Sequence, residues 1–140
     1  SGAGSKSGHV RVYEIKGDTW KQVGGDIDGE AAYDYSGRSV SLCADGNRVA
    51  IGASRNAGGG SFNGHVRVYE IEGGTWKQRG GDIDGEAASD QSGYSVSLSA
   101  NGTRVAIGAT HNNGGLTDNG HVRVFTLLPL LPSSTTTVSP

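Results

Sequence analysis

Hydrophobic and polar positions alternate along three short runs of the chain, which begin at His9, His65 and His121. The second run reads HVRVYEI, so that β-branched residues alternate with larger polar or aromatic ones. A period of two residues is typical of a β-strand, because successive side chains point to opposite faces of a sheet. Each of the three runs is therefore expected to form a strand.

The chain between the second and third runs predicts further strands separated by glycine-rich or polar segments. These are a brief strand at 75–80, a long polar connector at 81–93, strands at 94–100 and 103–109, and a loop at 111–120. The pair Asn101-Gly102 lies between the last two strands, and Asp45-Gly46 takes its place in the stretch between the first and second runs. Such pairs favour a tight hairpin turn in which both residues accept positive φ.

This pattern is an internal repeat, whose period is the spacing from His9 to His65 and from His65 to His121. When residues 9–64 are aligned with 65–120, 41 of 56 positions are identical. A period this long marks a supersecondary unit that stacks on copies of itself. A repeat also duplicates its polar residues, whereas an active site needs one asymmetric set. We therefore expect no enzymatic function, and the chain has no HExxH or CxxC spacing and no phosphate-binding glycine loop.

Four strands per repeat are the content of a β-propeller blade, so the expected fold class is all-β. The predicted organisation is a partial blade at 1–35, a full blade at 36–91, a partial blade at 92–127 and a Pro/Ser/Thr-rich tail at 128–140. About two and a half repeats are too few to close a ring, since propellers have about four blades or more. The array is therefore expected to be open within one chain.

Two segments carry a family resemblance. Residues 36–54 (SGRSVSLCADGNRVAIGAS) and 92–110 (SGYSVSLSANGTRVAIGAT), each followed by a glycine-rich loop and GHVRV, resemble FG-GAP repeats, the blades of integrin-α-like propellers. The resemblance covers residues 3–127. The segment TWKQ-x-GGDIDGEA is similar to a calcium-free variant found in secreted repeat proteins of microbes and algae. It implies a propeller fold and an extracellular protein. The short turns at 44–47 and 100–103 cannot supply the six or more oxygen ligands of the family's calcium site.

The acidic connector is the remaining candidate for a metal site. Its carboxylates could offer oxygen ligands to Ca²⁺; they belong to Asp26, Asp28, Glu30, Asp82, Asp84 and Glu86. Their spacing does not fit an EF-hand, because the glycine comes too early and no glutamate follows at position twelve. We favour a connector whose aspartates bind local backbone amides, with no metal and no cofactor, over weak calcium binding.

Trp20 and Trp76 recur at the same place in the repeat, where they could stack on a polymeric sugar or pack between blades. Packing is the favoured interpretation, because an amphipathic ring normally covers a core first. The recurring histidines are one blade apart, too far to share one zinc ion, and are expected to be structural. Cys43 is replaced by Ser99 in the next repeat, so the repeat encodes no disulfide or metal site within one chain. A small buried residue is favoured over a reactive thiol or a disulfide between chains.

Glycosylation is expected at two places. Asn101-Gly102-Thr103 is an N-linked sequon on a predicted exposed turn, although Asn101 could instead serve the turn through positive φ. The tail has the composition of an O-glycosylated stalk or an extended linker, and its candidate acceptors are Ser133, Ser134, Thr135, Thr136 and Thr137.

The net charge of −2 is spread evenly, and no apolar run reaches membrane-spanning length. We therefore expect neither a nucleic-acid partner nor membrane insertion. Because an open array leaves sheet faces and strand edges uncovered, the favoured function is an extracellular or cell-surface structural protein that self-assembles head to tail into a filament or ring. The alternative is an adhesion module, part of a larger surface protein, that binds glycans or proteins.

Overall fold

The computed structural model describes residues 6–55, 62–111 and 120–128, and these form only strands and turns. The strands are β1 (His9–Lys16), β2 (Thr19–Asp28), β3 (Ser36–Leu42), β4 (Arg48–Ala53), β5 (His65–Glu72), β6 (Thr75–Asp84), β7 (Ser92–Leu98), β8 (Arg104–Ala109) and β9 (His121–Thr126). The protein is therefore all-β, as the alternation of hydrophobic and polar positions predicts. No helix in these residues is long and apolar enough to cross a membrane.

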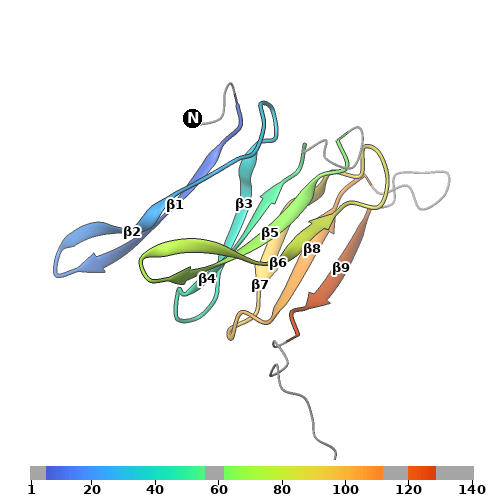
Figure 1. The fold of residues 1–140 in the computed structure, drawn as a ribbon. Coiled ribbons are helices and arrows are strands. Elements are labelled where there is room, and N and C mark those ends of the chain that lie inside the picture. The colour runs from blue at the N-terminus through green and yellow to red at the C-terminus, as the bar shows by residue number, and fades with distance from the viewer. Residues whose placement is uncertain (1–5, 56–61, 112–119, 129–140) are drawn as a thin grey trace, which may run out of the picture.

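The described strands form three antiparallel sheets, with the orders β1-β2, β3-β4-β5-β6 and β7-β8-β9. We call them the first, second and third sheets. They stand side by side in Figure 1, with the β1–β2 hairpin at one end of the row and β9 at the other. The row is open in the part of the chain that is described, since neither end sheet returns to meet the other.

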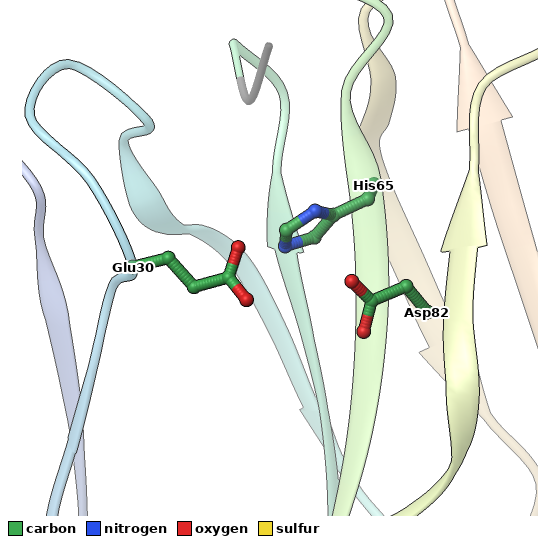
Figure 2. Close-up of side chains that lie close together, drawn as sticks. All are labelled: Glu30, His65 and Asp82. Carbon is green, nitrogen blue, oxygen red and sulfur yellow. The ribbon is translucent and has the colours of Figure 1, made fainter. Parts of the chain in front are cut away.

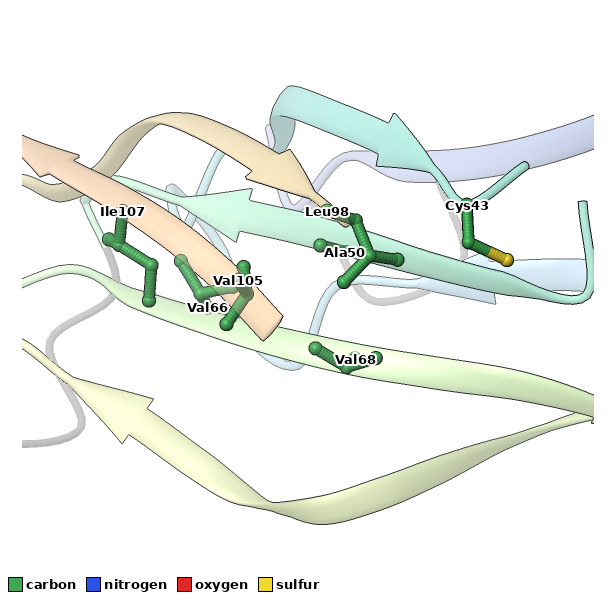
Figure 3. Packing of buried hydrophobic residues seen from close by; sticks show 7 residues of the cluster. All are labelled: Cys43, Ala50, Val66, Val68, Leu98, Val105 and Ile107. Carbon is green, nitrogen blue, oxygen red and sulfur yellow. The ribbon is translucent and has the colours of Figure 1, made fainter. Parts of the chain in front are cut away.

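Two hydrophobic layers hold the row together. The layer between the first and second sheets contains Val10, Val12, Ile27, Val49, Ile51 and Trp76. The layer between the second and third sheets contains Cys43, Ala50, Val66, Val68, Leu98, Val105 and Ile107 (Figure 3). Cys43 is buried in this second layer, as expected for a small core residue. The inward positions of each strand thus pack on the neighbouring sheet.

Close backbone approach lets the second and third sheets interlock. A Cβ atom on Gly52 of β4 would lie 2.1 Å from the Gly93 carbonyl oxygen of β7, so only glycine fits there. The Ser39 hydroxyl donates to the same Gly93 carbonyl over 2.7 Å. The Leu98 amide donates to the Ser41 hydroxyl over 3.0 Å, which ties the edge strands β3 and β7 to each other.

Three local expectations were wrong. The strand predicted at 75–80 continues as β6 through Asp84, because a bulge with Gly80 at φ 73° lets pairing with β5 resume beyond it. The strand predicted at 94–100 runs from Ser92 to Leu98. In the β7–β8 turn Gly102 has a positive φ of 73° but Asn101 does not. The Asn101 side chain instead accepts from the Thr103 amide at 3.1 Å, which is an Asx turn.

Candidate functional site

The most concentrated set of polar side chains lies where the connector after β2 meets the second sheet. Within the described residues, Glu30, His65 and Asp82 are the only three potential metal ligands whose donor atoms all lie within 4.8 Å of one another. Figure 2 shows Glu30 reaching from the connector toward His65 of β5 and Asp82 of β6. We call these three residues the interface cluster, since they join two repeats.

Arg67 supplies the positive charge of the interface cluster. Its guanidinium donates to both carboxylate oxygens of Asp82, at 2.7 and 2.8 Å, and also pairs with Glu30. The Arg67 side chain is only 12% exposed, so this is a sheltered double ion pair. Hydrogen bonding to Arg67 lowers the pKa of Asp82 to about 2, and Gln78 adds a further bond of 2.8 Å.

His65 completes the cluster as a neutral side chain. It is 4% exposed, and burial lowers the pKa of its imidazole, although nearby aspartates, Asp82 first, favour the charged form. A neutral imidazole beside two carboxylates is a set that a divalent cation could use. Here both carboxylates already have a guanidinium partner, so a cation would have to displace Arg67. The geometry therefore favours a clamp between sheets over a metal centre.

The other four carboxylates that the sequence offers as calcium candidates lie outside the interface cluster, and two of them pair with arginines. Asp26 pairs with Arg11 through two bonds of 2.8 Å, and this hydrogen bonding lowers the pKa of Asp26. Glu86 pairs with Arg123 of β9 at 3.3 Å. Asp28 and Asp84 are exposed at the ends of β2 and β6. Each of the three sheets thus contains an arginine that pairs with at least one candidate carboxylate: Arg11, Arg67 and Arg123.

The connector also contains two buried aspartates that bind backbone amides. Asp34 accepts from the Ala31 amide at 3.1 Å, and Asp90 accepts from the Ala87 amide at 3.0 Å. They are 3% and 1% exposed. Each connector is therefore a folded turn that delivers Glu30 or Glu86 to the next sheet.

The two tryptophans lie in different surroundings. Trp76 is 9% exposed, and its indole Nε1–H donates to the Val23 carbonyl of the first sheet over 2.8 Å. Trp20 holds the equivalent place in the first sheet and is 65% exposed. The structure thus places one tryptophan between two sheets and leaves the other on the surface.

The glycosylation candidates are only partly within the described residues. Asn101 is exposed in the β7–β8 turn, and its side-chain oxygen accepts from the Ser99 hydroxyl, the Thr103 amide and the Thr103 hydroxyl. Its amide nitrogen, the glycan acceptor, takes no part in these three bonds. The O-linked candidates Ser133, Ser134, Thr135, Thr136 and Thr137 lie outside the described residues.

Sequence reasoning did not assign a role to Arg67, although a signal was present. Arginine follows each repeated histidine by two positions, as Arg11, Arg67 and Arg123, and so lies on the same face of its strand. A histidine and an arginine repeated together on one face, opposite an acidic connector, indicate ion pairs between repeats.

Comparison with models of known protein families found no match, and neither did comparison with individual curated proteins. The function proposed below therefore depends on the chain's own geometry.

Proposed function

We propose that the chain is a non-enzymatic, extracellular structural protein whose propeller-type repeats assemble head to tail into a filament or ring. In this proposal the three sheets are blades of an FG-GAP-like array, and the first and third sheets are blades that other copies complete. The observation that carries it is the contrast between equivalent residues at the ends and in the middle of the row.

At the β1–β2 end, a surface of large side chains is uncovered. It consists of Tyr13, Ile15 and Trp20, which are 47%, 57% and 65% exposed. Their counterparts one repeat later, Tyr69, Ile71 and Trp76, pack against the first sheet. We call the first three residues the leading face. Large exposed apolar groups on one side of a sheet favour a protein partner.

At the β9 end, the uncovered side chains are smaller. Val122 and Val124 are 69% and 64% exposed, whereas their counterparts Val66 and Val68 are 0% and 8% exposed. We call these two valines the trailing face. Inside the row, the residues equivalent to the leading face (a leading-type face) pack on the residues equivalent to the trailing face (a trailing-type face) of the neighbouring sheet. The two ends of the row are therefore complementary to each other, and neither end is complementary to itself. Contacts of this heterologous kind generate filaments or rings.

The test is the oligomeric state of the full chain, residues 1–140. Sedimentation velocity over a range of concentrations, with negative-stain electron microscopy, should show association into periodic fibres or closed particles. Ile15→Lys should weaken it, because a charge would enter the leading face, whereas Lys16→Ala at the adjacent exposed position should not. A chain that stays monomeric at all concentrations would overturn the proposal.

A second candidate function is an adhesion module that binds glycans, and the exposure of Trp20 is the observation that favours it. An indole ring beside Tyr13 on an open surface can stack on a sugar. A glycan array probed with the wild-type chain and with Trp20→Ala tests this function. If the wild-type chain binds a glycan saturably, Trp20→Ala abolishes that binding and the chain does not self-associate, then adhesion is the function and the assembly proposal is wrong.

A further inference from the structure

A pocket of about 380 Å³ lies between the second and third sheets, lined by the β6 bulge at Arg79 and Gly80 and by residues of β8 and β9. The equivalent place between the first and second sheets is filled. There the Trp76 ring lies over Gly24, so closely that a Cβ atom on that glycine would come within 2.7 Å of the ring, and Trp76 donates to the Val23 carbonyl. The pocket therefore has the position and the lining of a tryptophan site.

The repeat does not supply that tryptophan from its own continuation. Pro132 stands one repeat after Trp76, and Leu131 stands one repeat after Thr75. Proline lacks the amide that a paired strand needs, and it has no indole to donate to a carbonyl. The chain does have one further tryptophan, Trp20, and it is exposed.

β9, which lines the pocket, also lacks the ion pair with β8 that the repeat predicts. In the second sheet Arg48 of β4 pairs with Glu70 of β5 at 3.0 Å. In the third sheet Arg104 of β8 lies opposite Thr126 of β9 and has no ion pair within the described residues. Glu14 of β1 holds the place of Glu70. β1 would thus give β8 a charge partner that β9 cannot.

The equivalents of the interface cluster at β9 and at β1 are each incomplete, which also favours a β1–β2 hairpin beside β8. At β9, Arg123 pairs with Glu86, but Val138 stands in the sequence where the second sheet has Asp82. At β1, Arg11 pairs with Asp26, and no described residue takes the place of Glu30. A β1–β2 hairpin placed beside β8 would join the two partial clusters into one complete set.

We propose that the β1–β2 hairpin of a second copy replaces β9 beside β8, and that Trp20 of the second copy enters the pocket of the first. The exchange rests on the head-to-tail assembly proposed above and replaces simple stacking of the two end faces: β9 leaves with Val122 and Val124, and the leading face of the second copy packs on the second sheet of the first, where the pocket lies. β1 and β9 begin with the same HVRV residues, so β8 keeps its pairing register, and exchange of near-identical elements costs little. The incoming hairpin adds β2 as a fourth strand. Since β9 stands two repeats after β1, each copy adds two periods to the array.

Charge variants at the exchanged strand test the proposal. Thr126→Glu gives Arg104 an ion partner within its own chain, so β9 should hold its place and association should weaken roughly tenfold. Thr126→Gln is the control with the same shape and no charge, and it should associate as the wild type does. Arg104→Glu should also weaken association, and adding Glu14→Arg in the same chain should restore it.

Trp20 reports the same event by its fluorescence. As the concentration rises, its emission should shift to shorter wavelength because the indole leaves water, and a chain with Trp20→Phe should show no shift. If the chain associates but Thr126→Glu and Arg104→Glu have no effect, the exchange is wrong and head-to-tail assembly stands. If removal of residues 129–140 lets Trp20 shift where the full chain shows none, the chain's own tail fills the pocket and the exchange is wrong. If nothing associates, both proposals are wrong.

Discussion

Trp76 and Trp20 hold equivalent places in the repeat, but one is buried and the other is exposed. Truncating them should therefore have unequal effects on the free energy of unfolding. Trp76→Ala removes a ring packed between sheets and the donor to the Val23 carbonyl. We expect it to lower the free energy of unfolding by about 3–5 kcal/mol. Trp20→Ala should lower it by less than about 0.5 kcal/mol in the monomer. Denaturant titrations followed by circular dichroism in dilute solution would measure both, and equal losses would contradict the packing described.

His65 should make stability depend on pH. Burial lowers the pKa of its imidazole in the folded state, while an unfolded histidine has a pKa of about 6.5. The unfolded chain therefore binds the proton more readily, so this contribution is fully present above pH 6.5 and is lost as the pH falls toward the folded pKa. Urea titrations from pH 7 to 5 should show falling stability, and His65→Gln should flatten that slope. His9→Gln makes the same substitution at the exposed equivalent position and is the matched variant for comparison.

Some of this could be predicted from single residues and some could not. The burial of Cys43 follows from its apolar neighbours and from Ser99 one repeat later. The interface cluster does not, because Glu30 and Asp82 belong to different repeats and meet only when the sheets stack. The conformation of Asn101 was not predictable either. The pair Asn101-Gly102 favours positive φ at both residues, but Asn101 does not have a positive φ, and its side chain accepts from the Thr103 amide in an Asx turn.

At the scale of elements, two equivalent glycines test how closely the sheets approach. Gly52→Ala would bring a methyl group within 2.1 Å of the Gly93 carbonyl oxygen, so the second and third sheets would have to separate. We expect a loss of about 1–3 kcal/mol in the free energy of unfolding. Gly108→Ala meets only the Ser95 hydroxyl, at 2.4 Å, which can rotate away. Its loss should be smaller, and thermal melts of both variants would show the order.

Strand positions were the most predictable level of the structure, because alternation and turn residues are local signals. The extension of β6 was not predictable in this way. Residues 81–84 read as a polar connector, yet Asp84 pairs with His65 of β5 in the strand register, and Asp82 is held by its ion pair with Arg67. Cross-strand partners thus overrode composition at this place.

At the scale of the whole molecule, the asymmetry of the ends would give the proposed assembly a direction. Each interface inside the row joins a covered leading-type face to a covered trailing-type face. The exposed copies of these faces lie at opposite ends of one chain. Growth of the proposed assembly would therefore keep one polarity, and a defect at one end of a copy would leave its other end able to bind.

This polarity gives a prediction with two defective chains. Trp20→Ala damages the leading face and leaves the trailing face intact. Gly108→Ala should damage the trailing end, since Gly108 would meet the next copy's sheet as Gly52 meets the third sheet. Each variant alone should remain monomeric. Mixed in equal amounts, they should form a one-to-one dimer and no larger species, because each retains the face that the other has lost. Native mass spectrometry would count the copies; larger mixed assemblies, or no dimer at all, would show that the ends do not bind each other in this directional way.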